Sequence, residues 1–500
     1  MRLRRRGRRE RAARVAPTPR APRTRRAPAL IVLAAVLVAG GVVDRRARAA
    51  GPGQGSAVSA QVPVAAPASA RSSAWYCAGA PASGTAADAT VIVANAGARR
   101  LTGTITVFPD KGDSRRVPLD VGPASRAAVR LADVVTSQLA AAVVELDGGE
   151  AVAEVVASGP LGDSVTPCAS SASSSWYFAE GVTTKDAQEF LLALNPFPDD
   201  AVVDVVFSTE EGVVSPQALT GLLVKGQALT AINVGDYVQR RESVSARLVA
   251  RTGRLAVSRV QTFDGTGPTG RKGVSVTLGA AAPGPTWYFP EGLVTDGQSE
   301  RYQIYNPGTD EAQVEVDLAL ETGEAEPLRL TVPRESRLTI VSAEESRIPK
   351  GVPHAVTVRS TGGPQVVAER TIDGTAPSAR TGVAITLGAR LPAKRWATAA
   401  GAADDNTDEW VVVQNPGPRS AKVSVNLLAD GTPVAVGPDL TSVDVPAGQR
   451  KALHVNPALK RPTTPLLITS TEAVVVERDY YKLRAPGLAM SAAIPLRDVT

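Results

Sequence analysis

One tryptophan-led element recurs along the chain about every hundred residues. Its complete copies are residues 176–181, WYFAEG, and residues 287–292, WYFPEG; a degenerate copy begins at Trp75, and a fourth, at Trp396, keeps only the tryptophan. The four copies therefore begin at positions 75, 176, 287 and 396. A period of this length is too long for a solenoid repeat and fits whole domains in tandem. The chain is expected to contain four related units.

A second landmark, an asparagine, keeps the four copies in register. Asn95, Asn195, Asn306 and Asn415 each follow an apolar run, and a glycine recurs at nearly the same distance after each of them, at positions 112, 212, 323 and 431. Between these landmarks apolar and polar residues alternate, as in residues 312–318 of the third copy, AQVEVDL. This period of two is typical of a β-strand with one buried face. The turn-forming residues on either side indicate where the strand begins and ends.

A later strand pattern ends in an arginine. Arg259, Arg370 and Arg478 follow the tryptophans of their copies at almost the same distance, whereas the first copy has Val155 at this position. Seven or eight short strands per copy favour an all-β fold of four tandem β-sandwich, Ig-like domains. A closed propeller-like ring is the alternative. The expected β domains are residues 75–168, 176–278, 287–387 and 395–500.

The N-terminal part does not follow the repeat. We expect a basic disordered tail at residues 1–26, a transmembrane or signal helix at 27–43 and a Gly-, Pro-, Ala- and Ser-rich linker at 50–74. The apolar run at 27–43 is at the short limit for crossing a bilayer and slightly long for a signal peptide. Twelve arginines precede it and three follow, which predicts a single-pass segment with an extracytoplasmic C-terminal part. Secretion after cleavage near Ala49 is the alternative.

The charge of the chain is divided unequally. The net charge is +6, but residues 1–48 hold fifteen arginines and two acids, so the remainder carries a net charge of −7. A folded part with this charge lacks the positive face that phosphate contacts require. The sequence therefore predicts no nucleic-acid partner.

Few residues point to redox or metal chemistry. Cys77 and Cys168 are the only cysteines and bracket the first unit, which in an exported chain predicts a disulfide. Closing this long loop would contribute roughly 4–5 kcal/mol. The two histidines, His354 and His454, have no partners at metal-ligand spacing, so no metal site is predicted. Residues 265–270 match G-x-G-x-x-G, but Pro268 removes a donor and a strand follows, so a turn is expected and no cofactor.

The charged residues tied to the repeat are Glu180, Glu291, Arg259, Arg370 and Arg478. We interpret them, with Trp75, Trp176, Trp287 and Trp396, as structural residues that define the repeat and as weaker candidates for ligand contact. A pair of carboxylates could hydrolyse a glycoside. A carboxylate that recurs once per unit does not create the two unlike environments that such a pair needs. No catalytic residue is therefore assigned.

These motifs together resemble repeats found in exported proteins of actinobacteria. The Trp-Tyr-Phe-x-Glu-Gly opening, the Asn-Pro before an alternating strand and the Val-x-Glu-Arg strand carry the resemblance, as does the Arg-rich N-terminus followed by one apolar segment. The layout is similar to an uncharacterised family of secreted or membrane-anchored envelope proteins of unknown function. Domain one lacks the glutamate and the arginine, and domain four lacks most of the opening motif. The resemblance implies no activity.

The sequence thus predicts a non-enzymatic cell-envelope protein. Its tandem β domains would serve as a scaffold or binding module for an envelope glycan or a partner protein, with residues 27–43 in the membrane. A carboxylate-based glycan hydrolase and a purely structural stalk are the alternatives.

Overall fold

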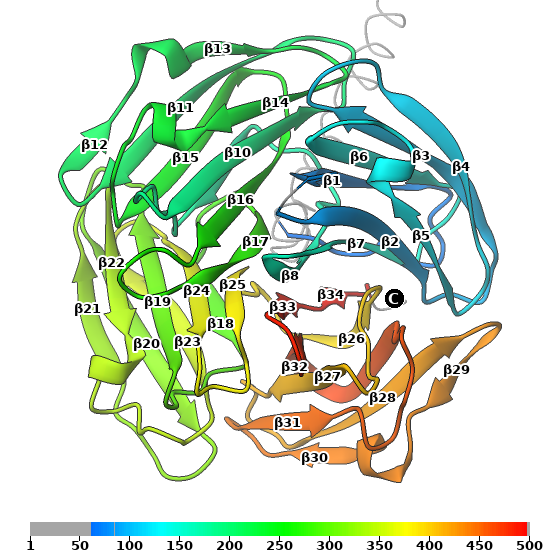
Figure 1. The fold of residues 1–500 in the computed structure, drawn as a ribbon. Helices are drawn as coiled ribbons and strands as arrows, with labels where there is room; N and C mark the ends of the chain where they lie inside the picture. The colour runs from blue at the N-terminus through cyan, green and yellow to red at the C-terminus, as the bar shows by residue number, and fades with distance from the viewer. Residues whose placement is uncertain (1–61, 85, 498–500) are drawn as a thin grey trace, which may run out of the picture. The chain divides into compact units, whose positions relative to one another are not determined.

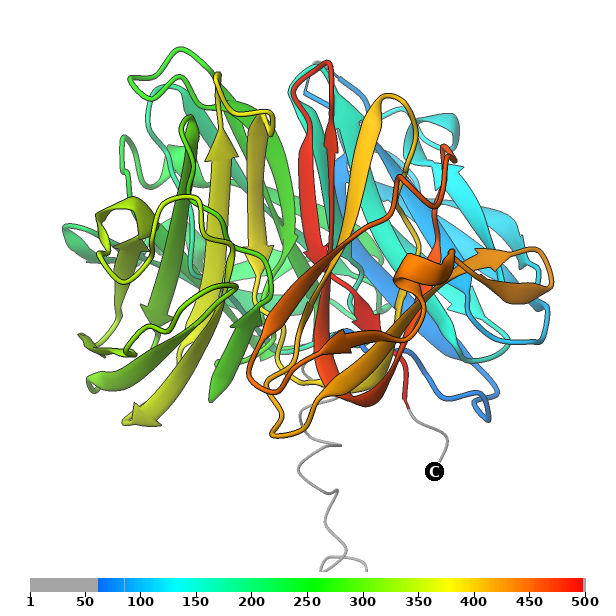
Figure 2. The same ribbon diagram turned by 90° about the horizontal axis from the view of Figure 1, so that it is seen from below.

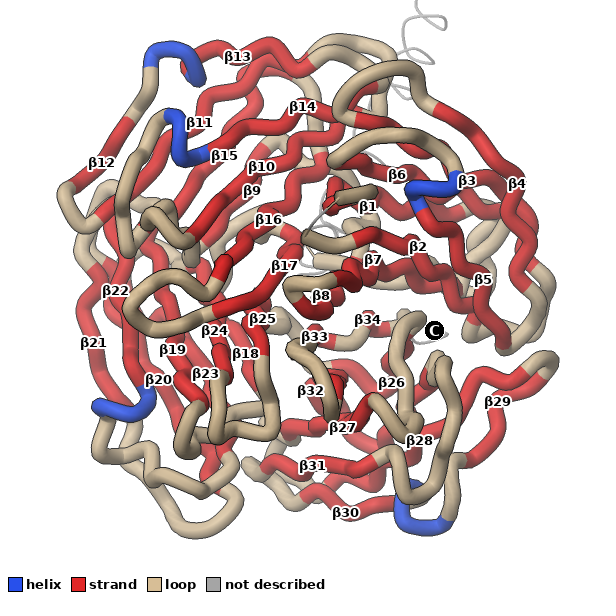
Figure 3. Tube along the Cα trace, viewed as in Figure 1, coloured by secondary structure: helices blue, strands red, loops and turns tan. Residues whose placement is uncertain are grey.

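Strands dominate the part of the chain that this computed structural model describes, which is residues 62–84 and 86–497 (Figure 1, Figure 3). Short 3-10 turns are the only helical elements there, which confirms the all-β class. Among these residues, none belongs to a helix with the length and apolar character needed to cross a bilayer. The predicted tail at 1–26, the apolar segment at 27–43, the cleavage position near Ala49 and the linker as far as residue 61 lie outside the described residues.

The strands fall into four successive groups, here called repeats 1 to 4. Repeat 1 contains β1 (Ser73–Pro81), β2 (Asp88–Asn95), β3 (Leu101–Pro109), β4 (Arg115–Val121), β5 (Ser125–Arg130), β6 (Leu139–Leu146), β7 (Ala151–Gly159) and β8 (Gly162–Pro167). Repeat 2 contains β9 (Ser175–Phe178), β10 (Ala187–Asn195), β11 (Ala201–Thr209), β12 (Gly212–Val214), β13 (Thr220–Val224), β14 (Ala228–Asn233), β15 (Val244–Thr252), β16 (Ala256–Asp264) and β17 (Lys272–Leu278).

Repeats 3 and 4 continue the pattern. Repeat 3 contains β18 (Thr286–Phe289), β19 (Gln298–Asn306), β20 (Ala312–Leu320), β21 (Leu328–Val332), β22 (Ser336–Val341), β23 (His354–Gly362), β24 (Val367–Gly374) and β25 (Gly382–Leu387). Repeat 4 contains β26 (Ala393–Thr398), β27 (Thr407–Gln414), β28 (Ala421–Ala429), β29 (Thr432–Ala435), β30 (Val443–Val445), β31 (Arg450–His454), β32 (Leu466–Lys482), β33 (Leu488–Ala492) and β34 (Ile494–Pro495). The 3-10 turns are η1 (Leu131–Asp133), η2 (Gln217–Leu219), η3 (Val234–Asp236), η4 (Ser342–Glu344) and η5 (Pro438–Leu440).

Each of the first three repeats consists of two open antiparallel sheets. The sheet that begins with the tryptophan strand has the order β1-β6-β3-β4 in repeat 1, and we call it the tryptophan sheet. The other sheet has the order β5-β2-β7-β8, and we call it the axial sheet. In repeat 4 the long strand β32 runs through both, pairing first with β26 and β28 and then with β27 and β33. No barrel closes among the described strands.

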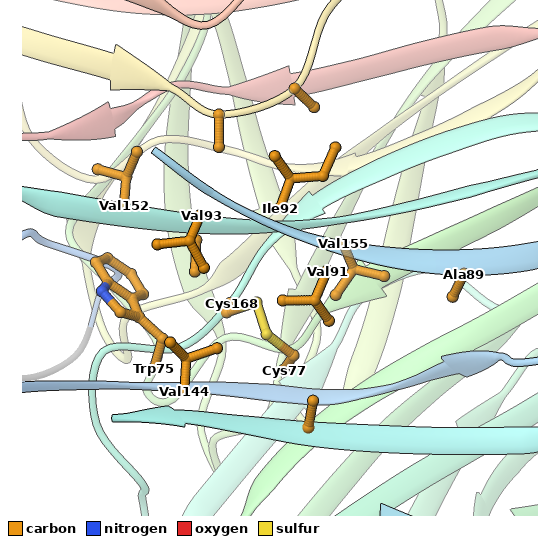
Figure 4. Close-up of a cluster of buried hydrophobic side chains, with 14 of the residues drawn as sticks. Trp75, Cys77, Ala89, Val91, Ile92, Val93, Val144, Val152, Val155 and Cys168 are labelled. Atoms are coloured by element: carbon orange, nitrogen blue, oxygen red, sulfur yellow. A yellow bond between two sulfur atoms is a disulfide. The ribbon is translucent and has the colours of Figure 1, made fainter. Parts of the chain in front are cut away.

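The repeated tryptophan fills the core of each repeat. Trp75, Trp176, Trp287 and Trp396 are at most 2% exposed. In repeats 2 to 4 the indole N–H donates to the backbone carbonyl of Leu255, Val366 or Val474, at 2.8–3.0 Å. A large apolar ring with one satisfied donor is the usual form of a buried tryptophan. Figure 4 shows Trp75 among valines of repeat 1, close to the disulfide between Cys77 and Cys168, which is present as expected.

The landmark asparagine folds the turn between the two sheets. The Nδ2 of Asn306 donates to the carbonyl oxygen of Asp310, four residues on, at 2.7 Å, and its Oδ1 accepts from the backbone N–H of Gly308. Asn95, Asn195 and Asn415 make the same pair of contacts, with the second reaching residue 97, 197 or 417. The alternating strand that follows in repeat 3, β20, buries every second residue, as predicted. An asparagine side chain that mimics a backbone turn explains why this residue recurs.

The last axial strands of the four repeats meet around a common axis (Figure 1, Figure 2). Strand β8 packs against β17, β17 against β25, β25 against β33, and β33 returns to β8. Serine and threonine hydroxyls join these strands: Leu278 N donates to Thr166 Oγ1 at 3.0 Å, and Thr277 Oγ1 donates to the carbonyl oxygen of Ile385 at 2.8 Å. Before β1, Ala65 is fully buried and bridges to Leu496 of repeat 4. The first and last repeats are therefore in direct contact.

Candidate functional site

Three of the four seams between neighbouring repeats bury an ion pair. The pairs are Arg259 with Glu369 at 2.9 Å, Arg370 with Glu477, and Arg478 with Glu154 at 3.2 Å. All six side chains are at most 3% exposed. In repeat 3, Glu369 and Arg370 are adjacent in one strand, as are Glu477 and Arg478 in repeat 4. Adjacent side chains of a strand point to opposite faces, so the glutamate reaches the preceding repeat and the arginine reaches the next one. The pair of Arg478 with Glu154 joins the last repeat to the first.

The same glutamates satisfy backbone donors of the tryptophan-led element. Glu369 accepts from the backbone N–H of Glu180 at 2.6 Å, and Arg259 donates to the carbonyl oxygen of that same Glu180. Glu154 accepts from the N–H groups of Ala399 and Ala400, each at 2.7 Å. A buried charge is stable only when it is paired and hydrogen-bonded, and each of these carboxylates meets both conditions.

The fourth seam, between repeats 1 and 2, has lost both members of its pair. Val155 stands at the arginine position of repeat 1, and Ser258 stands at the glutamate position of repeat 2. Ser258 is buried and donates to the carbonyl oxygen of Gly79 at 2.7 Å. Loss of only one partner would leave an uncompensated buried charge, at a cost of several kcal/mol. The two departures from the repeat therefore compensate for each other.

The motif glutamates themselves are also paired. Glu180 contacts Arg337 of repeat 3 at 2.8 Å, and Glu291 contacts Arg380 at 2.8 Å and Arg450 of repeat 4 at 2.5 Å. Burial opposes ionisation of Glu291, but the two arginines outweigh it and hold the pKa of this carboxyl below its ordinary value. Both carboxylates are thus engaged in seams between repeats.

A second set of buried glutamates escaped the sequence analysis. Glu189, Glu300 and Glu409 each lie six residues before the landmark asparagine, and all are at most 1% exposed. Their carboxylates lie against the glycine that ends the tryptophan-led element: a Cβ added to Gly181, Gly292 or Gly401 would lie under 3 Å from one of their oxygens. The constant spacing to the asparagine was the signal that could have revealed them.

Repeat 1 tests this interpretation of the motif glycine. It has Ala89 at the position of the buried glutamate and Ala80 at the position of the glycine. Without a carboxylate beside it, the element tolerates a methyl group. Steric room for the glutamate is therefore one reason for the glycine in repeats 2 and 3, where Val244 O beside Gly181 and His354 beside Gly292 also leave no space for a Cβ. In repeat 4 Gly401 has in addition a φ of +139° that favours glycine.

The three buried glutamates have different partners. His354 lies 3.0 Å from Glu300, and Tyr302 donates to the same carboxylate at 2.6 Å. Burial opposes the charge on both groups, yet their mutual attraction lowers the pKa of Glu300 and raises the pKa of His354. Thr464 contacts Glu409, whereas no hydrogen bond reaches Glu189 from the described residues. Burial raises the pKa of both of these carboxyls to about 8, so they are mostly protonated at neutral pH.

The second histidine also has a structural partner. His454 Nε2 lies 2.5 Å from Asp408, and the imidazole stacks on Trp410 with 4.1 Å between ring centroids. Tyr481 and Trp410 donate to the same carboxylate. Within the described ranges, no group of three side chains has the arrangement of a metal site.

Two cavities lie outside these ion pairs. The axial cavity, of about 80 Å³, is lined by the ends of the four last axial strands, by three of the tryptophans and by Arg390. A polar cavity of about 440 Å³ lies at the loop end of repeat 2, where Leu161 of repeat 1 also contributes. The polar groups of this second cavity come from Thr183, Lys185, Asp186, Gln188, Glu189, Asn233, Asp236, Thr262 and Asp264. Neither cavity is lined by the motif glutamates.

Comparison with known proteins gives a family without a described activity. Residues 148–340 match the model of a family of unknown function, DUF5719. This match agrees with the expected resemblance to an uncharacterised family. No curated protein matches the chain.

Two solved structures are similar to parts of the chain. One is the crystal structure of Thermotoga maritima 1070, with 18% identity and a TM-score of 0.20, over 22% of this chain and 95% of that one. The other is Streptomyces avermitilis alpha-L-rhamnosidase complexed with L-rhamnose, with 12% identity and a TM-score of 0.12, over 78% of this chain and 54% of that one. Scores this low carry no argument about fold or function.

Proposed function

We propose that this chain is a non-enzymatic cell-envelope protein whose four β-sandwich, Ig-like repeats form one scaffold that binds an envelope glycan or a partner protein. The apolar run at residues 27–43 and the arginine distribution around it support a membrane tether, with secretion after cleavage near Ala49 as the alternative. The disulfide between Cys77 and Cys168 supports an oxidising compartment.

One observation carries the proposal. The charged residues that define the repeat are used in seams between repeats, each buried against a partner of opposite charge. A residue that must stay paired to hold two repeats together is not free to transfer protons to a substrate. The charged residues that define the repeat therefore hold neighbouring repeats together, and a ligand would bind to surfaces that differ between repeats.

The polar cavity of repeat 2 is the best candidate for such a surface. Its volume of about 440 Å³ lies within the range of roughly 300–1,000 Å³ that small-molecule sites occupy. Asp186, Asp236 and Asp264 supply acceptors and Lys185 supplies a donor, while Asn233 already donates to Asp236 at 2.9 Å. Closely spaced donors and acceptors of this kind suit a ligand rich in hydroxyl groups, which favours a glycan over an apolar ligand.

The experiment is a binding assay of the full chain against isolated envelope glycans. We expect saturable binding that the double variant Asp186→Asn, Asp236→Asn weakens at least tenfold. The control is Asp120→Asn, because Asp120 forms an exposed pair with Arg100 far from the cavity in the sequence. Binding unaffected by the double variant, or no binding to any envelope glycan, would contradict a glycan site here.

The alternatives from the sequence are separated by two further measurements. A glycan hydrolase predicts product release that Glu180→Gln or Glu291→Gln abolishes while the variants stay folded. A purely structural stalk predicts neither binding nor hydrolysis. Fractionation of an epitope-tagged chain, with mass spectrometry of its N-terminus, distinguishes the tethered form from the cleaved form.

A further inference from the structure

The axial cavity is lined by a half-buried arginine with no acidic partner among the described residues. Arg390 follows β25, and its guanidinium lies over the ring of Trp287 at 4.7 Å from the ring centroid. Within the described chain it donates to backbone carbonyl oxygens, those of Ala282 at 3.3 Å and Pro283 at 3.5 Å. The buried arginines of the seams, in contrast, each face a glutamate. Arg390 thus brings an uncompensated positive charge to the axis.

The lack of a counter-charge is reflected in the pKa of the side chain. Burial lowers the pKa of Arg390 to about 10, and no nearby carboxylate opposes the effect. No acidic residue is found in the described lining of the cavity. Two backbone carbonyl oxygens accept from Nη1 of Arg390, but no negative charge among the described residues balances the guanidinium.

Arg390 is the exception at its position in the repeat. The bridges of Tyr76, Tyr177 and Tyr288 to Ala169, Ala280 and Ala389 align the residues that follow, which are Ser170, Ala281 and Arg390. All three of these residues line the axial cavity. The backbone bridge is the same in these three repeats, but only repeat 3 places a charged residue at this position.

Hydroxyl groups surround the same cavity, and one of them is unused. Thr166 and Thr277 are engaged in bonds between axial strands. Thr386, at the equivalent position of repeat 3, is 6% exposed, and its hydroxyl has no hydrogen-bond partner among the described residues. A buried hydroxyl that lines a cavity and has no protein partner indicates that a water or a ligand completes its bonding.

We propose that the axial cavity binds one small oxyanion through the guanidinium of Arg390, with the hydroxyl of Thr386, which lines the same cavity, as a further donor. Guanidinium groups bind phosphate and carboxylate oxygens through paired N–H donors, and the threonine hydroxyl adds a further donor. A cavity of about 80 Å³ holds a few waters or one such group and has no room for a nucleotide. The anion is either a free inorganic ion or the acidic group at the end of a larger ligand.

The test is a titration of the full chain with inorganic phosphate, and in parallel with acetate, at constant ionic strength in chloride. Isothermal calorimetry gives the affinity, and thermal unfolding gives the stabilisation. We expect a single saturable site that Arg390→Gln weakens at least tenfold. Thr386→Val, which keeps the charge, should weaken it several-fold and covers the case in which Arg390→Gln fails to fold.

Arg271→Gln is the matched control. Arg271 also lies over an aromatic ring, that of Phe263 at 4.0 Å, and burial also lowers its pKa, but it does not line the axial cavity. This variant should bind phosphate as the unchanged chain does. Equal loss in Arg271→Gln and Arg390→Gln, or no saturable binding of either probe to the unchanged chain, would overturn the proposal. Binding of phosphate but not acetate would identify a tetrahedral oxyanion, and the reverse would identify a carboxylate group.

Discussion

The two buried glutamates Glu189 and Glu300 occupy the same position in adjacent repeats, yet their neutralisation should have opposite effects. Replacing Glu189 by glutamine removes a carboxyl that the folded chain keeps protonated, since burial raises its pKa from 4.5 to about 8. Replacing Glu300 by glutamine removes the partner of His354, which is also buried. At neutral pH, Glu189→Gln should therefore raise the free energy of unfolding, and Glu300→Gln should lower it.

The magnitude for Glu189 follows from linkage. A carboxyl with a folded pKa of about 8 and an unfolded value of 4.5 contributes stability that is complete below pH 4.5 and lost as the pH rises to about 8. At about 1.4 kcal/mol per pH unit, the unchanged chain should lose about 3 kcal/mol relative to Glu189→Gln between pH 5 and pH 7.5. Any fixed cost of burying the amide is the same at both pH values and cancels from this difference.

The assay is urea unfolding of the unchanged chain and both variants at half-unit steps from pH 5 to pH 8. For Glu300→Gln we expect a loss of about 1–3 kcal/mol at pH 7, because the variant removes the carboxylate that His354 and Tyr302 contact in a buried site. The pair contributes fully to stability between the ordinary pKa values of its groups, 4.5 and 6.5. This contribution is lost as the pH falls through the lowered pKa of Glu300 or rises through the raised pKa of His354. A stability difference between the unchanged chain and Glu189→Gln that does not change with pH across this range would refute the reasoning.

Three further changes probe the seams and the disulfide. Glu154→Gln should lower the free energy of unfolding by about 3–5 kcal/mol, because it leaves Arg478 uncompensated in the seam between the last and first repeats. Ala400→Glu should raise the free energy of unfolding by about 1 kcal/mol. In repeat 1, Arg126 occupies the strand position that Arg337 and Arg450 occupy in repeats 3 and 4, but Ala400 stands where the motif glutamate would face it. Burial lowers the pKa of Arg126. Reduction of the disulfide should cost roughly 4–5 kcal/mol by the loop-entropy estimate. Each is measured by denaturant unfolding at pH 7.

The controls for these changes are on the surface. Glu145→Gln breaks an exposed pair with Arg116 and should change stability by less than about 1 kcal/mol. An equal effect of Glu145→Gln and Glu154→Gln would contradict a special role for the closing seam. Ala400→Glu should stabilise the chain only while Arg126 is present, so the combination with Arg126→Leu should lose the gain. Reduced chain as stable as oxidised chain would contradict the contribution assigned to the disulfide.

The strands and core were accessible to the sequence because they depend on neighbours that are close in the chain. Alternation around Asn306 predicted β20, and the spacing of the tryptophans predicted the repeated core. The partners of Arg259 and Glu154 were not accessible, because they lie 110 and 324 residues away in another repeat. The sequence pattern of one repeat is the same in an open row of repeats as in a ring, so it does not distinguish the two arrangements.

Some of the missed information was nevertheless present in the sequence. Val155 departs from the repeat at the arginine position, and Ser258 is the matching departure at the glutamate position of the next copy. Two departures that together remove one arginine and one glutamate indicate that consecutive repeats touch through these positions. The buried glutamates Glu189, Glu300 and Glu409 were equally regular, but the polar type of the residue obscured their place in an otherwise apolar face.

Closure of the seam between repeats 4 and 1 fixes the number of repeats. An open row of sandwiches can gain or lose a unit by recombination and leave the remaining contacts intact. Here the last arginine takes its ion-pair partner from the first repeat, and the axial strands meet around a single axis. A fifth unit would have to be inserted at one seam, and the angle between neighbouring repeats would then have to change at every other seam. Genes for chains of this kind should therefore vary in their seams and loops while the number of repeats stays at four. A truncated protein with three repeats would expose two unmatched faces and would not be a shorter working protein.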